Sequence, residues 1–354
     1  MSMMDTIESI PIQLNKILKN KNLVDQNTQD YLKAFPDIKG IVFIASGTSY
    51  NAAFTTKKFA EDFINIPVEL IYPNIFVNYL NKSLLNKETL YVFISQGGKT
   101  KLVYEALEIV KSKGFPNISI TESLDSPIAK SADLALEMGS ENEAYMFRTL
   151  GYSATCATLY WLFTSLSKLY CGLSESEEQA LIEDYSKMVD NLPKIKNDTL
   201  DWYKKNKFTL MQKSKFLFSG TNDLWPVAQE ADIKFMEMLP ALTNSFELEE
   251  LIHGPQNAFD STTGYFILSR KGEDSEKAQK ISAFINTEIT KCFMVGEETT
   301  LDTDLPIVSP SKYFSSLEYI TVFQVLSYQL STDKGRDLSK GVYPQVVNYI
   351  EKSL

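Results

Sequence analysis

Short apolar runs alternate along this chain with longer segments in which apolar residues recur at helical spacing. This alternation predicts strands that are buried on both faces, each followed by a helix. In the first half, the pattern predicts strands at 40–46, 68–72, 89–95, 117–121 and 134–139, and helices at 50–64, 101–114 and 149–170. Short apolar strands connected by helices are typical of a parallel sheet with helices on both faces.

The same pattern begins again in the second half. The run 214–224 resembles the run 39–51, with Ser219 and Gly220 at the places of Ser46 and Gly47. The segments that follow predict helices at 224–239, 273–290 and 315–330 and strands at 264–269, 291–296 and 305–309. An internal repeat of about half the chain length predicts two similar α/β domains in tandem, each a flavodoxin-like or Rossmann-like three-layer sandwich.

These signals also predict where the domains begin and end. We expect an N-terminal helical segment at 1–34, the first α/β domain at 35–172, a polar helical connection at 173–206, the second α/β domain at 207–330 and a tail at 331–354 that completes the active site. None of these segments is of low complexity.

Composition narrows the classes of partner. The net charge is −10 and the isoelectric point is about 4.9, which disfavours binding to nucleic acid or to an anionic membrane. Three cysteines and one histidine, with no metal-ligand spacing, predict that no metal is bound. The start of the chain lacks the features of a signal peptide and no stretch reaches the length of a membrane span, so we expect a cytoplasmic protein.

Two polar turns follow strands of the first predicted sheet. They are Ser-Gly-Thr-Ser at 46–49 and Ser-Gln-Gly-Gly-Lys-Thr at 95–100. Ligands of open parallel sheets bind beyond the carboxyl ends of the strands, and hydroxyls beside a helix N-terminus suit a phosphate. The alternative is that these residues only cap helices. Neither turn matches a nucleotide-binding loop.

A helix at 223–239 carries a second candidate. Glu230, Lys234 and Glu237 are spaced four and three residues apart and therefore share one helix face. The spacing is compatible with a solvated stripe that contains an ordinary Glu–Lys pair. It is also compatible with a carboxylate held ready for proton transfer beside a lysine that controls the local field.

The third and fourth candidates lie nearer the C-terminus. His253 is the only histidine of the chain; it follows an acidic run and precedes Gly254 and Pro255. It is either a structural residue or a general base in a loop. The tail carries Arg336, Asp337 and Lys340. Such a tail is either solvated or brings its lysine to a phosphosugar.

Together, these motifs resemble the SIS (sugar isomerase) family, in particular the isomerase half of glucosamine-6-phosphate synthase and the related fructosamine-phosphate deglycases. The resemblance runs from about residue 30 to the end. It rests on the two turns, on Lys234 and Glu237 followed sixteen residues later by His253, and on the tail motif Arg-Asp-Leu-Ser-Lys-Gly-Val. The resemblance implies a substrate-binding set in the turns and tail: Gly47, Thr48, Ser49, Ser95, Gln96, Gly97, Gly98, Thr100 and Ser339.

The resemblance also implies roles for the other residues. Glu237 is the expected acid and base that moves a proton between C1 and C2, with Lys234 tuning it. His253 is the expected ring-opening residue, supplied by the neighbouring subunit, and Lys340 meets the open-chain sugar. These roles imply a homodimer with shared active sites and no metal or organic cofactor.

The sequence departs from the synthases in two places. Gly97 stands where they usually carry serine, and 141–155 replaces a family motif, with Arg148 at its lysine position. Because the first cysteine is Cys156, we expect no glutaminase domain of the kind that the synthases carry. We therefore expect deglycation of a fructosamine 6-phosphate, such as fructoselysine 6-phosphate, to glucose 6-phosphate and an amine. The alternatives are a glucosamine-6-phosphate deaminase or isomerase, and a sugar-phosphate sensor without catalysis.

Overall fold

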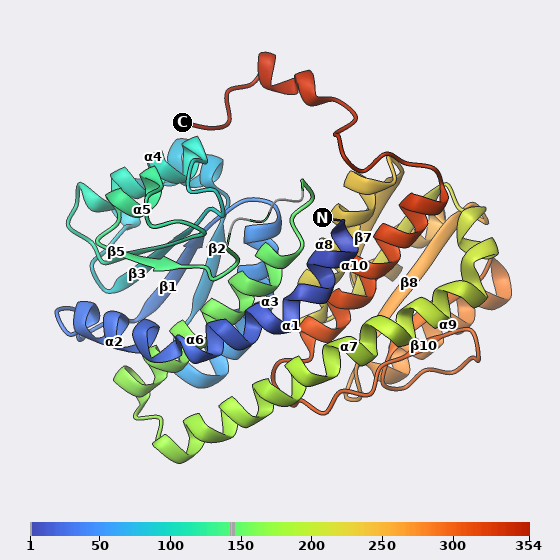
Figure 1. Cartoon of the computed structure of the whole chain (residues 1–354), viewed down its shortest axis with the longest axis horizontal. Helices are drawn as coiled ribbons and strands as arrows, with labels where there is room; N and C mark the ends of the chain where they lie inside the picture. Colours follow the sequence, from blue (N-terminus) through green and yellow to red (C-terminus); the bar gives the residue numbers. More distant parts are fainter. Residues whose placement is uncertain (1, 142, 144–145) are drawn as a thin grey trace. The chain divides into compact units, whose positions relative to one another are not determined.

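The computed structural model describes residues 2–141, 143 and 146–354, and its chain divides into two compact units. The sheet-1 unit comprises 12–144, 150–182 and 343–354, and the sheet-2 unit comprises 1–11, 145–149 and 183–342. Each unit contains one five-stranded parallel sheet with helices on both faces (Figure 1). The α/β class and the two tandem sheets predicted from the sequence are confirmed.

The first sheet has the order β2-β1-β3-β4-β5. Its strands are β1 (Gly40–Ile44), β2 (Val68–Ile71), β3 (Thr89–Ile94), β4 (Asn117–Thr121) and β5 (Leu134–Glu137). Its helices are α3 (Thr48–Ile64), α4 (Lys101–Lys111), α5 (Pro127–Ser131) and α6 (Leu150–Cys171), with the short turns η1 (Ile75–Tyr79) and η2 (Lys82–Leu84). All pairings are parallel.

Alternation along the strands assigns each side chain of the first sheet to a face. Tyr91 and Phe93 pack with Val103 and Leu107 of α4. On the other face, the ring of Phe43 lies edge-on to Phe163 of α6, with centroids 5.9 Å apart. Figure 1 shows α4 and α5 on one side of this sheet and α3 and α6 on the other. Because both faces are covered at the centre of the sheet, the central strands β1 and β3 are largely apolar, which is why the sequence pattern revealed them.

The second sheet has the order β7-β6-β8-β9-β10. Its strands are β6 (Lys215–Gly220), β7 (Leu242–Glu247), β8 (Thr263–Ser269), β9 (Cys292–Gly296) and β10 (Leu305–Pro306). Its helices are α8 (Leu224–Met238), α9 (Ser275–Glu288) and α10 (Ser316–Asp333), with the 3-10 turns η3 (Glu250–Ile252) and η4 (Pro255–Ala258). The strand β7 was not predicted, because it is an edge strand whose residues are exposed or only half-buried.

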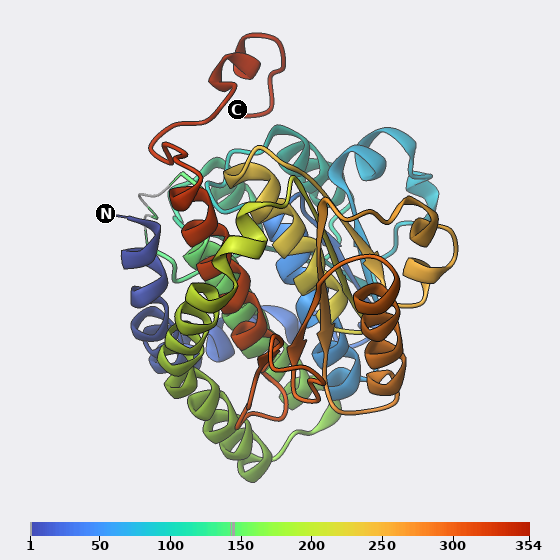
Figure 2. The same cartoon turned by 90° about the vertical axis from the view of Figure 1, so that its right-hand side faces the viewer.

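Aromatic residues fill one face of the second sheet. Phe218 of β6 contacts Phe235 of α8 at 4.9 Å and Phe323 of α10 at 5.5 Å between ring centroids. The neighbouring residue on β6, Leu217, points to the opposite face and packs with Ile281 of α9. Figure 2 shows this layering, with α9 in orange on one side of the strands and α8 and α10 in gold and red on the other.

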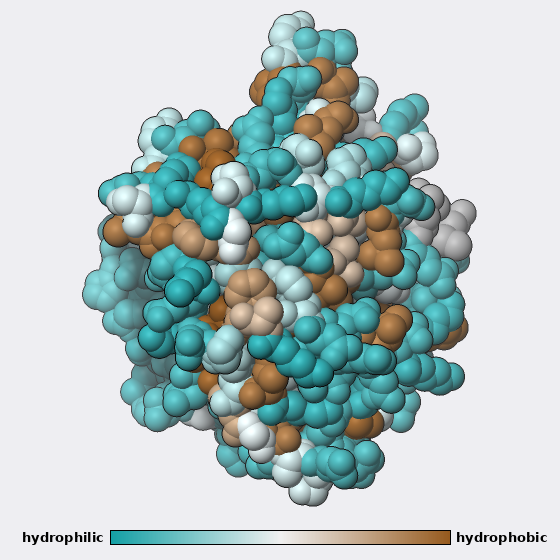
Figure 3. All heavy atoms as spheres, turned by 90° about the vertical axis from the view of Figure 1, so that its left-hand side faces the viewer, coloured by the Kyte–Doolittle hydropathy of each residue, from teal (hydrophilic) through white to brown (hydrophobic). Residues whose placement is uncertain are grey.

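The remaining helices are α1 (Met3–Lys19), α2 (Lys21–Leu32) and α7 (Glu175–Met211), and η5 (Pro344–Asn348) is a 3-10 turn in the tail. In the part of the chain that the structure describes, no helix combines the length and the apolar composition that crossing a bilayer requires. The surface in Figure 3 is mainly hydrophilic, with scattered apolar groups that include the tail at the top. Val346, Val347 and Ile350 are exposed apolar residues of that tail.

Candidate functional site

The first turn joins β1 to the N-terminus of α3. Gly47 adopts φ = +57°, a left-handed conformation that favours glycine, and Thr48 and Ser49 form the first turn of the helix. The backbone N–H of Asn51 donates to the carbonyl of Gly47 at 3.0 Å. The predicted turn therefore lies at a carboxyl strand end and leads into a helix of seventeen residues, whose N-terminus favours an anion.

The second turn joins β3 to α4, next to the first turn because β1 and β3 are neighbours. The hydroxyls of Ser95 and Thr100 lie 2.8 Å apart and hydrogen-bond to each other. Gly98 has φ = +61°, and a Cβ there would come within 2.1 Å of the Ser126 hydroxyl. A Cβ at Gly97 would meet nothing within 4 Å. The glycine at 98 is thus required by the turn, whereas the one at 97 leaves open space.

Gln96 of the second turn is held by a buried carboxylate that sequence reasoning missed. Glu143 accepts hydrogen bonds from the backbone N–H groups of Leu150 and Gly151, both at 3.0 Å, and from Nε2 of Gln96 at 3.2 Å. It therefore caps the N-terminus of α6 and positions Gln96 at once. Gly151 allows this, because a Cβ there would lie 2.0 Å from Oε1 of Gln96. The available signal was an acidic residue shortly before a long apolar helix.

The end of the tail pairs with the second turn. Ser353 and Thr100 form an antiparallel bridge, and the backbone N–H of Leu354 donates to the carbonyl of Lys99 at 2.9 Å. The carbonyl of Lys352 accepts from the backbone N–H of Lys101 at 3.2 Å. Since Lys101 is the first residue of α4, the tail occupies one of the donors that a helix N-terminus offers to an anion.

In the sheet-2 unit, α8 presents the predicted lysine and carboxylates. The Lys234 ammonium lies 2.8 Å from Oε2 of Glu237 and 3.7 Å from Oε1 of Glu230. Lys234 and Glu230 each expose 1% of their side chains, whereas Glu237 exposes 42%. The interpretation of a solvated stripe is therefore wrong. A buried cation instead holds a carboxylate that reaches solvent, which is an arrangement suited to proton transfer with a ligand.

His253 lies between η3 and η4, on the connection from β7 to β8. Its side chain is 60% exposed, and Nε2 lies 2.9 Å from Oε1 of Glu249. Glu249 also pairs with Lys277, and its pKa is lowered first by the hydrogen bond from Lys277 and then by that from His253. The imidazole is thus oriented by a carboxylate and presented at the surface, rather than buried as a structural residue.

The tail motif forms a compact set of contacts of its own. Asp337 accepts hydrogen bonds from the hydroxyl and the backbone N–H of Ser339, and it pairs with the Lys340 ammonium at 3.1 Å. These bonds, led by the Ser339 hydroxyl, lower the pKa of Asp337 to about 2. Arg336 donates to the carbonyls of Asp337 and Lys340, both at 2.9 Å. The Lys340 side chain is 72% exposed.

The predicted residues therefore fall into two groups. The turns with Gly47, Ser95 and Thr100 lie in the sheet-1 unit, and Lys234, Glu237, His253, Ser339 and Lys340 lie in the sheet-2 unit. Within the first group, Ser95 and Thr100 are in contact; within the second, Lys234 contacts Glu237. In the described residues, no cluster of three His, Cys, Asp or Glu side chains could hold a metal ion.

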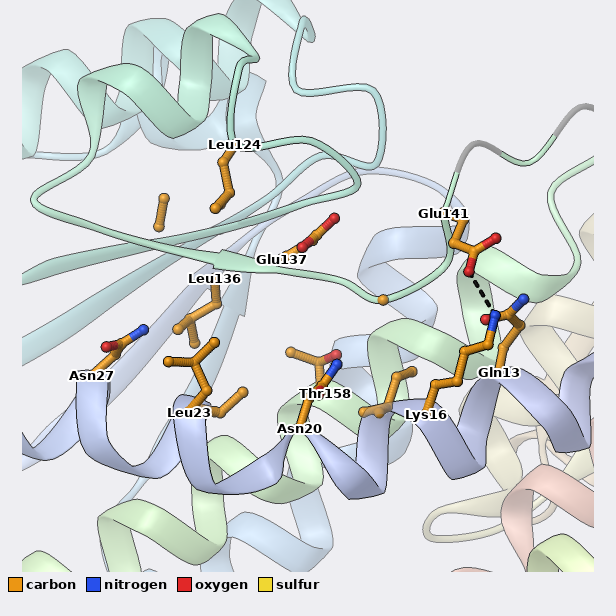
Figure 4. Close-up of a pocket in the computed structure, with 14 residues that line it drawn as sticks. Gln13, Lys16, Asn20, Leu23, Asn27, Leu124, Leu136, Glu137, Glu141 and Thr158 are labelled. Carbon is orange, nitrogen blue, oxygen red and sulfur yellow. Dashed lines mark hydrogen bonds and ion pairs between the residues drawn. The ribbon is translucent and has the colours of Figure 1, made fainter.

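A separate cavity of about 270 Å³ lies in the sheet-1 unit, between β5 and the helices α1 and α2 (Figure 4). Leu23, Leu124 and Leu136 supply its apolar wall, and the ion pair of Lys16 with Glu141 lies at one end. Its lining includes none of the residues predicted for the active site. The cavity is therefore distinct from both groups of candidate residues.

Comparison with known proteins finds a family whose model matches part of this chain. Residues 35–165 match the SIS domain family. The chain is 26% identical over 332 residues to glutamine–fructose-6-phosphate aminotransferase (isomerizing) of Clostridium tetani (strain Massachusetts / E88), which covers 92% of this chain and 54% of that enzyme. The chain thus spans about half the length of the curated relatives it matches.

Solved structures share the fold over nearly the whole chain. A provisionally named phosphosugar isomerase from Clostridium difficile 630 has a TM-score of 0.89 at 22% identity, covering 99% of both chains. Glucosamine-6-phosphate deaminase from Thermotoga maritima has a TM-score of 0.74 at 22% identity, covering 97% of this chain and 99% of that one. The resemblance to the SIS family that the sequence motifs predicted is confirmed.

Proposed function

We propose that this chain, which carries an SIS domain over residues 35–165, is a phosphosugar-isomerase-type enzyme that deglycates fructosamine 6-phosphates. The observation that carries the proposal is the pairing of the buried Lys234 with the half-exposed Glu237. A sensor needs a phosphate-binding turn but has no use for a carboxylate held in this way. The SIS fold and the sequence similarity to an isomerizing aminotransferase support the same class of chemistry.

The turns of the sheet-1 unit would bind the phosphate group. Their hydroxyls, on Thr48, Ser49, Ser95 and Thr100, precede or begin helices, and the backbone N–H groups there favour an anion. Gln96, which is held by Glu143, would donate a further hydrogen bond. Binding energy from the phosphate would hold the reacting carbons in place at the other end of the sugar.

Glu237 would then move one proton. It removes a proton from C1 of the open-chain ketoamine, and the C2 oxygen takes up a proton, which gives an enaminol. Return of the proton to C2 leaves an imine at C1. Water adds to the imine, and the carbon–nitrogen bond breaks to release the amine and glucose 6-phosphate. One water is consumed and no electrons are transferred, so the sequence balances without a redox cofactor.

His253 and Lys340 would act in ring opening and in binding of the open-chain sugar, respectively. The His253 ring is exposed and oriented by Glu249, which suits a residue offered to the substrate of a neighbouring subunit for ring opening. Lys340 and Ser339 are arranged by Asp337 and would meet the open-chain sugar. The active enzyme in this proposal is a homodimer with shared sites, working in the cytoplasm without a metal.

A coupled assay of glucose 6-phosphate release from fructoselysine 6-phosphate tests the proposal. We expect release by the wild type, a loss of about 10²–10⁴-fold in Glu237→Gln and no change in the exposed control Glu276→Gln. Substrate binding should survive in Glu237→Gln. The similarity to a deaminase of Thermotoga maritima makes glucosamine 6-phosphate the second substrate to test. Binding of both sugars without turnover would contradict catalysis and indicate a sensor.

A further inference from the structure

The sheet-2 unit brings three separate segments of the chain together beside the proposed chemistry. Phe147 is buried and shares one apolar cluster with Met238 of α8 and Leu338 of the tail. Met238 directly follows Glu237 in the chain, and Leu338 lies two residues before Lys340. All of these residues belong to the sheet-2 unit. The segment that contains Phe147 is therefore anchored next to both elements that carry the proposed chemistry.

Met146, the residue before this anchor, is open to solvent. It is 52% exposed, whereas Phe147 is buried. A Cβ built on Gly341 would lie 3.8 Å from Sδ of Met146, which places the thioether against the backbone of the residue that follows Lys340. Val342, the next residue of the tail, is also apolar and exposed. An accessible apolar surface, formed by Met146 and Val342, therefore lies beside Lys340.

The covalent structure of a fructosamine decides which part of the substrate meets this surface. The nitrogen is bonded to C1, the carbon from which Glu237 would take a proton. The first carbon of the amine's chain is therefore two bonds from C1, in whatever orientation the sugar binds. The phosphate is at the other end of the sugar. An exposed side chain beside the elements of Glu237 and Lys340 is thus placed to contact the amine part of the substrate, and not the phosphate.

The side chain of methionine suits an aliphatic partner. Its unbranched thioether has three rotatable bonds and adapts to apolar surfaces, and it carries no charge and no strong hydrogen-bonding group. Each methylene group of a ligand that is fully buried against it would tighten binding by about fourfold. The alternative is that Met146 only covers the tail. In that case, truncation of Met146 would loosen the tail and weaken all ligands of this site alike.

We propose that Met146 is a specificity-determining residue, which selects substrates whose amine carries an unbranched alkyl chain at the nitrogen. Val342 supplies a second apolar contact to that chain. The inference rests on the deglycation proposed above and deepens it by naming the part of the substrate that this chain recognises. A ligand without an alkyl chain, such as 1-amino-1-deoxyfructose 6-phosphate, leaves the thioether in water and gains nothing from it.

Calorimetric titration of the full chain with two inert analogues tests the role of Met146 without requiring turnover. Both are 1-amino-1-deoxyhexitol 6-phosphates, which lack the C2 carbonyl and cannot be deglycated; one carries an N-butyl group and the other carries none. We expect the wild type to bind the butyl compound about tenfold more tightly. Met146→Ala should reduce this preference to about twofold, by weakening the butyl compound alone. Met146→Leu should retain the preference, and Leu124→Ala, at an equally exposed position in the sheet-1 unit, should not change it.

Turnover separates this inference from the proposed function. Met146→Ala should raise KM about tenfold for fructoselysine 6-phosphate, leave kcat unchanged and leave KM for 1-amino-1-deoxyfructose 6-phosphate within about twofold. Equal affinity of the two analogues in the wild type, a butyl preference that survives in Met146→Ala, or an equal loss for both analogues in that variant overturns the role of Met146, even if the protein deglycates. A butyl preference that depends on Met146, without turnover of either substrate, overturns deglycation and supports the binding role. Failure of both analogues to bind overturns both proposals.

Discussion

Lys234 places its ammonium 2.8 Å from the carboxylate of Glu237, although Lys234 is buried and Glu237 reaches solvent. The same ammonium lies 3.7 Å from the buried Glu230. One cation therefore serves two carboxylates in different surroundings. The ion pair with Glu237 holds the proposed acid and base in place. The ion pair with Glu230 stabilises the fold, because a buried carboxylate needs a cation or hydrogen bonds nearby.

We expect Lys234→Met to lower the free energy of unfolding by about 3 kcal/mol, because it removes the buried cation beside Glu230. Urea denaturation measures this. The control Lys204→Met removes an exposed pair with Asp201 and should leave the free energy of unfolding nearly unchanged. The double variant Glu230→Gln/Lys234→Met should recover part of the loss, since a neutral glutamine then replaces the buried carboxylate of Glu230. Equal, small losses in both single variants would contradict the role given to Lys234.

The two glycines of the second turn predict opposite outcomes. Gly97→Ser adds the hydroxyl that the synthases carry, into open space, and we expect phosphate to bind about three- to tenfold more tightly. Gly98→Ala places a Cβ against Ser126 in a left-handed backbone conformation, and we expect weaker phosphate binding and a lower unfolding midpoint. Calorimetry with inorganic phosphate measures both affinities. Weaker binding in Gly97→Ser would show that the phosphate does not approach this turn.

Whether a strand could be predicted from the sequence depended on how many of its side chains are buried. The strands β1, β3 and β8 are covered on both faces and are therefore continuously apolar, so the sequence pattern predicted them. The strand β7 has its residues exposed or only half-buried, and its mixed sequence, Leu-Thr-Asn-Ser-Phe-Glu, carried no such pattern. Sequence patterns detect strands through the apolar residues that they bury, and β7 buries too few.

The candidate site residues also divide into those that the sequence predicted and those that it did not. The turn residues and Lys234–Glu237 were found through local spacing. Burial of Lys234 and Glu230 could not be predicted, because an i,i+4 pair has the same spacing on a solvated face and on a buried one. Glu143 was missed because its function depends on a contact with Gln96, 47 residues away along the chain. A contact across that separation leaves no periodic signal in a single sequence.

The tail offers a test of the phosphate turn. The carbonyl of Lys352 accepts the hydrogen bond that the Lys101 N–H at the start of α4 could give to an anion. Removing residues 350–354 frees this donor, and we expect inorganic phosphate to bind about three- to tenfold more tightly. The control Glu351→Gln weakens only the side-chain pair with Lys101 and should leave the affinity within about twofold. If the truncated chain bound inorganic phosphate with unchanged affinity, the Lys101 N–H would not be part of the phosphate-binding site.

The burial of the Glu318 carboxyl should make the stability of the protein depend on pH. It is fully buried in the first turn of α10, and Oε1 accepts a hydrogen bond from Asn191 at 2.6 Å. Burial raises its pKa from 4.5 to about 7, with Arg270 lowering it and Glu297 raising it in smaller measure. Between pH 4.5 and 7 the folded protein therefore binds more protons at this group than the unfolded chain does. The stability that Glu318 contributes is fully present below about pH 4.5 and is lost as the pH rises to about 7.

We therefore expect Glu318→Gln to flatten the dependence of the unfolding free energy on pH. Relative to the wild type, the variant should gain about 3 kcal/mol on going from pH 4.5 to pH 8, because a glutamine has no charge to bury at high pH. Urea denaturation at four pH values across this range measures the difference. Glu288→Gln, at an exposed position on α9, is the matched control and should follow the wild-type slope. Parallel curves for the wild type and Glu318→Gln would mean that this carboxyl is ionised in the folded protein throughout the range, with its charge balanced by its surroundings.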